Sequence, residues 1–170
     1  MRILGIDPGS RITGFAVVDT GERRMRACGY GVIRPSAEAI GERLGEIFTG
    51  VMQVIAELKP DVLAIESVFM ARNAQSALKL GQARGVAICA AAQAGLPVFE
   101  YAPRAVKLAV VGSGRADKAQ VQHMMRQILK IEAALAADAA DALAIAVCHA
   151  HTQHSLAYAG RQSAATEMRP

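Results

Sequence analysis

Four acidic residues of this 170-residue chain stand where carboxylates could hold a divalent cation. Asp7 ends the first apolar run of the chain, and Glu66 ends another short apolar run, residues 62–65. Asp138 and Asp141 lie three positions apart, a spacing that places both on one face of a helix. Hard ions such as Mg²⁺ take carboxylate oxygens and complete their shell with water and substrate phosphate. The set therefore predicts a site for a divalent cation such as Mg²⁺.

Each of these carboxylates also has an explanation without metal. Asp7 could cap the turn at Pro8-Gly9, because Asp side chains hydrogen-bond a following turn. Asp138 and Asp141 could form the solvated face of an alanine-rich helix. However, the two like charges repel each other, and no Lys or Arg within one turn compensates them. Together with the two strand-end carboxylates, the pair favours a metal site.

Three histidines, His149, His151 and His154, raise the alternative of a different metal site. They lie beyond the carboxylate pair, near the fraying end of the last predicted helix. We interpret them as surface histidines, because exposed histidine is commoner than metal ligation.

Strand and helix patterns explain how Asp7 and Glu66 come together. The apolar run before Asp7 stops at Pro8-Gly9, which cannot continue a helix, so we predict a buried strand. Two strands of an antiparallel meander, a helix and another buried strand follow at 14–18, 25–33, 36–58 and 62–65. A helix that returns the chain to a new buried strand is a crossover, so residues 62–65 should run parallel to the first strand. Asp7 and Glu66 then share one edge of the sheet.

Small residues mark two places where another segment should approach closely. Gly5 lies on the same face of its strand as Asp7, so something bulky can pass beside the carboxylate. In a helix predicted for residues 74–94, every fourth position is small: Ala77, Gly81, Gly85 and Cys89. Each interior glycine costs about 1 kcal/mol, so a partner must compensate for it. Packing on the sheet and packing on a second subunit both remain open.

The second half of the chain completes one α/β domain. Its remaining parts are a strand, a basic segment and two helices, at 98–101, 104–118, 118–130 and 133–151. Asp117 and Gln120 resemble a capping box at the start of the first of these helices. The domain should span residues 1–154, and the small polar residues of 155–170 predict a disordered tail.

Composition narrows the class of protein. With 52% hydrophobic and 20% charged residues, the chain fits one compact domain with a large core. Its net charge of +4, much of it from arginine, favours a phosphate-bearing partner over a membrane. No stretch is long enough to span a bilayer and no signal peptide is recognisable, so we expect a cytoplasmic protein. The cysteines, Cys28, Cys89 and Cys148, lack metal spacing and are predicted to be reduced fillers.

Four stretches of the chain resemble the RuvC family of bacterial Holliday-junction resolvases: residues 5–14 (GIDPGSRITG), 64–73 (AIESVFMARN), 76–85 (SALKLGQARG) and 137–144 (ADAADALA). The order and spacing of the motifs match over the predicted domain. The resemblance implies a ribonuclease-H-like fold, with a mixed five-stranded sheet flanked by helices. It also implies a homodimeric endonuclease that nicks two opposed strands of a four-way DNA junction in recombination and repair. The RuvA–RuvB branch-migration complex is its implied partner.

The resemblance also assigns the catalytic residues. The family's carboxylates fall on Asp7, Glu66, Asp138 and Asp141, without a departure from the pattern. They would hold two Mg²⁺ ions about 3.5 to 4 Å apart for phosphodiester hydrolysis, with Mn²⁺ able to substitute. Asp7, central on the first strand, is the expected bridging ligand.

DNA-binding residues are predicted partly from the resemblance and partly from charge. Lys107 and Lys118 match lysines that the resemblance marks as important for junction binding and catalysis. Phe69 falls where the family stacks a ring on an unpaired base, although composition alone leaves a core role about equally open. Five more candidates rest on charge and position only: Arg72, Lys79, Arg84, Arg104 and Arg115. Their alternative is a solvated surface charge.

Two other classes of function compete with a nuclease. Phosphate-binding kinases and ATPases of the actin and sugar-kinase type share a first hairpin with the pattern found here at Asp7, Gly9, Thr13 and Gly14. They enclose a nucleotide between two such domains, and 170 residues provide one. A non-catalytic junction-binding module is the third hypothesis, against which the complete carboxylate set argues.

Overall fold

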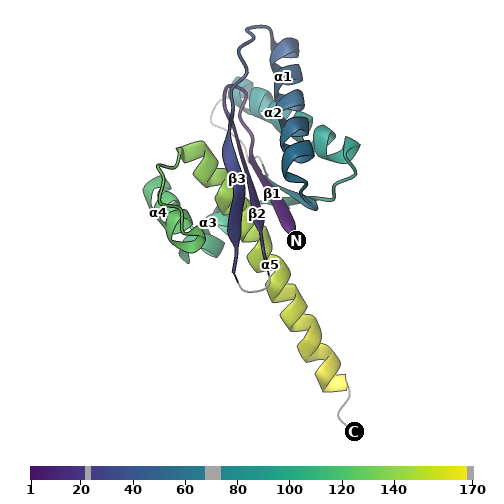
Figure 1. Cartoon of the computed structure of the whole chain (residues 1–170), viewed down its shortest axis with the longest axis vertical. Coiled ribbons are helices and arrows are strands. Elements are labelled where there is room, and N and C mark those ends of the chain that lie inside the picture. Colours follow the sequence, from purple (N-terminus) through teal and green to yellow (C-terminus); the bar gives the residue numbers. More distant parts are fainter. Residues whose placement is uncertain (22–23, 68–73, 168–170) are drawn as a thin grey trace.

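The computed structural model shows a central β-sheet with helices on both faces (Figure 1). It describes the backbone of residues 1–21, 24–67 and 74–167, and the side chains of these ranges as far as residue 156. The strands are β1 (Arg2–Asp7), β2 (Thr13–Asp19), β3 (Arg26–Ile33), β4 (Val62–Glu66) and β5 (Val98–Tyr101). The helices are α1 (Ile40–Leu58), α2 (Ala74–Gln93), α3 (Pro103–Val111), α4 (Lys118–Leu129) and α5 (Ala137–Glu167).

The sheet has the mixed topology that the sequence predicts. Its strand order is β3-β2-β1-β4-β5, in which β2 pairs antiparallel with β1 and β3, while β4 and β5 continue the sheet in parallel with β1. The β1–β4 pairing ends with Ile6 opposite Ile65, so the carboxyl ends of the two strands meet. Asp7 and Glu66 therefore lie at the same edge of the sheet, as the crossover predicts.

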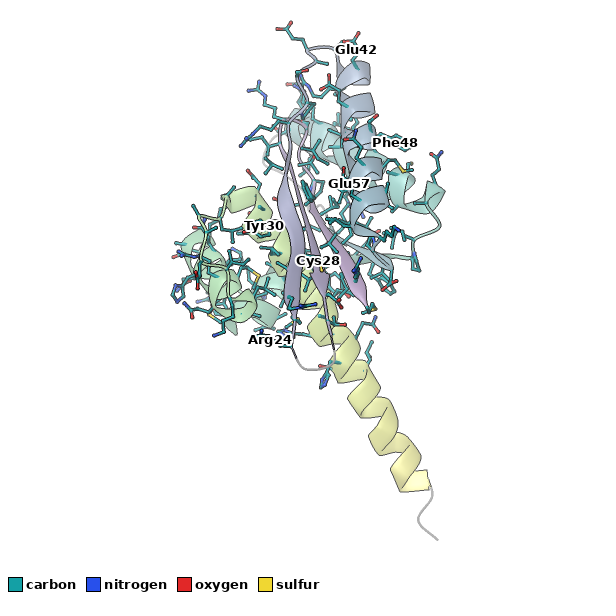
Figure 2. The ribbon with its side chains drawn as sticks, viewed as in Figure 1. Arg24, Cys28, Tyr30, Glu42, Phe48 and Glu57 are labelled. Carbon is teal, nitrogen blue, oxygen red and sulfur yellow. The ribbon has the colours of Figure 1, made fainter. Side chains whose placement is uncertain are left out.

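The helices form two layers (Figure 1). On one face, α1 and α2 cover a core that includes Leu4, Ile6 and Leu63. On the other face, α3, α4 and α5 cover a core that includes Ile3 and Val18. Alternation along β1 explains this division, because successive side chains of a strand point to opposite faces. The outer surface of α1 is polar, with exposed Glu42 and Glu57 near its opposite ends (Figure 2).

α5 lies directly on the sheet because two glycines leave room for its backbone. A Cβ atom at Gly5 would overlap the carbonyl oxygen of Ala142, and one at Gly14 would overlap the carbonyl oxygen of Asp138. The close approach predicted at Gly5 is therefore confirmed. The approaching segment is the helix that carries the aspartate pair.

Two helices differ from the sequence prediction. α3 lies in a segment whose pattern indicates charge rather than helix; Pro103 opens it, and Gly112 ends it in the left-handed conformation. α5 continues to Glu167 and extends away from the sheet (Figure 1), so the helix end predicted at 151 is wrong. α5 runs on past residue 155, where we predicted the tail to begin, because the Ala, Leu, Gln and Arg residues that follow favour helix. No helix in the described ranges is apolar enough over a sufficient length to cross a bilayer.

The row of small residues on α2 faces away from the sheet. The buried face of the helix consists of other residues: Ala83, Ala87, Ala90 and Ala91. In contrast, Gly81 and Cys89 of the row are exposed. A Cβ atom at Gly81 or Gly85 would meet nothing within 4 Å. Packing of this row on the sheet is therefore wrong, and a subunit interface stays a prediction.

The three cysteines are free, but two of them are not fillers. Cys148 is buried, whereas Cys89 on α2 and Cys28 on β3 (Figure 2) are exposed. Cys28 lies on an edge strand and Cys89 on an outward helix face. Apolar neighbours in sequence therefore do not bury these two side chains.

Candidate active site

Neighbouring strand ends place the carboxylates of Asp7 and Glu66. Asp7 is the last residue of β1, and Glu66 is the last residue of β4. The chain turns after Asp7 and returns through Thr13, a fully buried residue. The Thr13 hydroxyl donates a 2.8 Å hydrogen bond to the carbonyl oxygen of Gly9 and so closes the turn. Strand pairing and this closed turn hold the two carboxylates on rigid elements.

α5, held against the sheet by the two glycines described above, supplies the aspartate pair. Asp141 joins Asp7 and Glu66 in a cleft of about 270 Å³. Asp138 does not line this cleft, although its charge acts on Asp7. The structure thus brings three of the predicted carboxylates together and places the fourth beside them.

The cleft combines charged and apolar walls. Lys107 of α3 and Lys118 of α4 line it together with the carboxylates. The remaining lining residues are apolar: Pro103, Val106, Val121, Ala144 and Ile145. The Nζ atom of Lys118 lies 3.1 Å from Oδ2 of Asp141 in an ion pair. Lys118 is the first residue of α4, whose start is fixed by the predicted capping box of Asp117 and Gln120.

The clustered carboxylates disfavour each other's ionised forms. Burial, followed by the charges of Asp141 and Glu66, raises the pKa of Asp7 to about 7. Burial and then the charge of Asp141 also raise the pKa of Glu66. Lys118 opposes both shifts, and its hydrogen bond to Asp141 raises its own pKa. The cleft is therefore short of positive charge, which Lys118 supplies only in part.

The donor set suits a hard divalent cation in both chemistry and charge. All its ligands would be carboxylate oxygens, and a cation would compensate the repulsion that raises the pKa of Asp7. Within the described part of the chain, no group of three or more His, Cys, Asp or Glu side chains is already arranged as a metal site. Asp141 is instead turned to the Lys118 ammonium group. A bound cation would thus take the place of the Lys118 ammonium group beside Asp141.

Arg84 of α2 contacts the backbone of Glu66 without lining the cleft. Its Nε atom donates a 3.2 Å hydrogen bond to the backbone carbonyl of Glu66, and its guanidinium group pairs with Glu100 of β5. These contacts tie α2 to the ends of β4 and β5. Arg84 thus has a supporting role in the structure, and its DNA contact stays a prediction.

The other DNA-binding candidates that the structure describes do not line the cleft. Three of them are exposed on the surface: Lys79 on α2, Arg104 on α3, and Arg115 between α3 and α4. Two more candidates lie outside the described residues: Phe69 and Arg72. DNA contacts of these five residues stay predictions.

The surface interpretation of the histidines is wrong for His149. Only 1% of this residue is exposed, and its Nδ1 atom lies 2.7 Å from the hydroxyl oxygen of Tyr101. The Nδ1 atom of His151 lies 3.0 Å from the carbonyl oxygen of Ala109 on α3, and His154 is exposed as predicted. α5 does not fray at 149, and the core continues beneath it, which explains the difference.

Sequence reasoning also missed parts of the site that depend on α3 and β2. Val106 lines the cleft from α3, a helix that the sequence pattern does not indicate. Gly14 admits α5 beside Asp138. A glycine inside a strand is a known sign of close approach, so Gly14 could have been found.

Several described proteins are similar to this chain in sequence over most of its length. The family model described as crossover junction endodeoxyribonuclease RuvC matches residues 3–149. A protein of that description from Photobacterium profundum is 59% identical over 96% of this chain and 95% of its own length. Another, from Tolumonas auensis, is 58% identical over 91% of this chain and 89% of its own length.

Solved structures share the fold. T. thermophilus RuvC in complex with Holliday junction substrate matches with a TM-score of 0.83 and 39% identity, over 90% of this chain and 94% of that one. A yeast mitochondrial Holliday junction resolvase, 13% identical, matches with a TM-score of 0.65 over 92% of this chain and 80% of its own, which shows the fold alone. The predicted ribonuclease-H-like fold with a mixed five-stranded sheet is thus confirmed. The chain belongs to the RuvC family of crossover junction endodeoxyribonucleases.

Proposed function

We propose that this protein is a structure-specific endonuclease that resolves four-way DNA junctions in recombination and repair by cutting two opposed strands. The observation that carries the proposal is the cleft in which Asp7, Glu66 and Asp141 meet Lys107 and Lys118. Carboxylates for a cation and ammonium groups for a phosphate are the two needs of phosphodiester hydrolysis. A RuvC of this fold has been solved in complex with a Holliday junction substrate, which supports the choice of substrate.

We assign the metal site to Asp7, Glu66, Asp138 and Asp141, with two Mg²⁺ ions that Mn²⁺ can replace. Bound ions would supply a water of lowered pKa and stabilise the leaving 3′ oxygen. Asp7 ends the strand next to that of Glu66, and the charges of Glu66, Asp138 and Asp141 all raise its pKa, so it is our choice for the ligand that both ions would share.

The other side chains of the cleft bind and orient the substrate. Lys107 and Lys118 attract the phosphate at the cut and neutralise part of its charge. Lys118 can turn from Asp141 to a phosphate oxygen, because its side chain is 73% exposed and its ammonium group carries three donors. Val106 and Val121 exclude water from one side of the cleft, which strengthens these charge interactions.

We infer a homodimer that forms through α2. The outward row of small residues allows close backbone approach, and Leu78 on the same helix, 68% exposed, offers apolar surface beside it. A two-fold axis through this interface would present two clefts to two opposed DNA strands. Family resemblance adds the RuvA–RuvB complex as a partner and the cytoplasm as the place of action.

Cutting of a synthetic four-way junction tests the proposed function. With Mg²⁺ we expect paired, symmetric nicks in the junction, no nicks in a linear duplex of the same sequence, and no cutting in EDTA. Junction binding without cutting in either Mg²⁺ or Mn²⁺ would instead indicate a non-catalytic junction-binding module. ATP binding by calorimetry without cutting would indicate the kinase-type alternative, which the single sheet of the described residues does not favour.

A further inference from the structure

A buried polar cluster between α5 and β5 lies outside the cleft and has no part in the chemistry above. Its centre is His149, one of two buried polar residues among the described side chains. The Nδ1 atom of His149 and the hydroxyl oxygen of Tyr101 are 2.7 Å apart. The imidazole packs on Phe99 with ring centroids 4.5 Å apart and meets the Tyr101 ring edge-on at 5.8 Å. The ring of His149 is thus fixed on two sides.

Tyr101 is joined to the strand end that carries Glu66. In the pairing of β4 with β5, Tyr101 stands opposite Glu66. The carbonyl oxygen of Tyr101 accepts a 2.8 Å hydrogen bond from the N–H group of Ser67, the next residue after Glu66. A shift of Glu66 is therefore coupled to a shift of Tyr101.

His149 is joined to the part of α5 that carries Asp141. Asp141, Ile145 and His149 follow one another at four-residue intervals, the spacing of neighbours on a helix surface. Asp141 and Ile145 both line the cleft. A rotation of α5 about its axis that moved Asp141 would therefore move His149 as well.

Packing constrains the rotation of α5 without giving it a directional polar contact. The backbone of the helix lies against Gly5 and Gly14, and Leu143, Ile145 and Val147 are buried beside it. The other buried residues of the helix are mostly alanines, whose short side chains interlock less with the sheet than larger ones do. A hydrogen bond depends strongly on distance and angle, and it is strengthened where water is excluded. The bond at His149 therefore adds a directional constraint to the rotation that packing sets.

We propose that the His149–Tyr101 hydrogen bond positions α5 so that Asp141 faces Asp7 and Glu66. Both members act as positioning residues, since neither lines the cleft. Burial lowers the pKa of His149, which keeps the imidazole neutral at neutral pH and suited to a bond with a neutral hydroxyl. The inference rests on the proposed nuclease function and adds to it a pair of residues that acts through the carboxylates.

Replacing Tyr101 by Phe tests this role, because it removes the hydroxyl group and keeps the ring. Tyr101→Phe should cut prebound junction about tenfold more slowly in a single turnover, a typical effect of losing a supporting contact. Its affinity for the junction should change less than twofold. Without DNA, Mn²⁺ should raise its melting temperature less than it raises that of the unchanged protein, because the carboxylates converge less well. His149→Asn, which keeps a polar atom near the position of Nδ1, should retain more activity than His149→Leu.

Phe99→Leu is the matched control, since it removes a ring that packs on His149 and keeps the hydrogen bond. It should lower the melting temperature at least as much as Tyr101→Phe and still cut at the normal rate, when both are measured well below melting. A normal rate and a normal Mn²⁺ response of Tyr101→Phe would overturn the proposal. An equal loss of rate in Phe99→Leu would also overturn it, because the cluster would then serve stability alone. Failure of the unchanged protein to cut junctions would overturn the nuclease function, and the Mn²⁺ response of Tyr101→Phe would still decide the positioning role.

Discussion

Asp7 shows, at the level of a single residue, why a cation would suit the cleft. Its pKa of about 7 arises first from burial and then from the charges of Asp141 and Glu66. Because this value lies above the ordinary one, folding favours the protonated form, and stability from this group is lost as pH rises from about 4 through 7. A bound cation would reverse the penalty. The arrangement that destabilises the metal-free chain thus favours metal uptake.

Asp7→Asn should therefore stabilise the metal-free protein at pH 8 and change its stability little at pH 4. The amide cannot ionise, so the gain at pH 8 has an upper limit on the order of 4 kcal/mol, set by the pKa shift. Urea unfolding in EDTA at the two pH values measures it. Asp19→Asn is a control that should change stability in the opposite direction and destabilise the protein at pH 8. The reason is that the N–H group of Gly21 lowers the pKa of Asp19. A destabilised Asp7→Asn protein at pH 8 would contradict the electrostatic origin of the shift.

Phe69 lies outside the described residues, so its role is predicted from the resemblance. If it stacks on a base, Phe69→Ala should fold normally and lose cutting, because a stacking interaction worth about 1 to 3 kcal/mol holds the opened strand. If it belongs to the core, the same change should cost about 3 to 5 kcal/mol of stability. Tryptophan should restore cutting and leucine should not. Melting temperatures and junction cutting of the three variants decide; rescue of a destabilised alanine variant by leucine would make Phe69 a core residue.

At the level of elements, strand ends could be predicted from the sequence and helix faces could not. An apolar run that stops at Pro8-Gly9 indicates a buried strand, and the crossover rule fixes the direction of β4. In α2, both the buried face and the exposed row consist of small residues, so composition does not tell them apart. His149 is buried by Tyr101, which lies 48 positions away along the chain. No local pattern reveals such a contact.

The exposed row of α2 leads to a prediction about assembly. Gly81→Glu should leave the fold intact, because a Cβ atom there meets nothing within 4 Å and Glu favours helix over Gly. It should nevertheless dissociate the dimer, since a charge would be buried at the interface without a partner. Sedimentation should show a dimer for the unchanged protein and a 17.9 kDa monomer for the variant. Ala56→Glu, on the exposed surface of α1, is the control and should remain dimeric. An unchanged protein that sediments only as a monomer would contradict the prediction.

At the level of the whole molecule, the site and the far end of α5 are separate. The described core reaches along α5 as far as Ala150, and the helix then extends away from the sheet (Figure 1). The carboxylates lie at the opposite end of this helix. Residues after 154 are therefore not needed to hold the cleft.

A chain shortened to residues 1–154 should fold and cut junctions at the normal rate. Circular dichroism during heating and single-turnover cutting measure the two properties. We expect a melting temperature within a few degrees of that of the whole chain, because the removed residues lie beyond the described core. Loss of folding or of cutting would place the domain boundary further along α5.

We propose that four carboxylates from two strands and one helix form a hydrolytic centre, and that basic residues in and around the same cleft bind the DNA. The most direct measurement compares junction binding and junction cutting by the unchanged protein and by Asp7→Asn, Glu66→Gln, Asp138→Asn and Asp141→Asn in Mg²⁺. Each variant should bind the junction with near-normal affinity and fail to cut it, because the basic surface persists while a ligand is lost. Substantial cutting by one variant would remove that residue from the centre. Cutting by all four would contradict the claim itself.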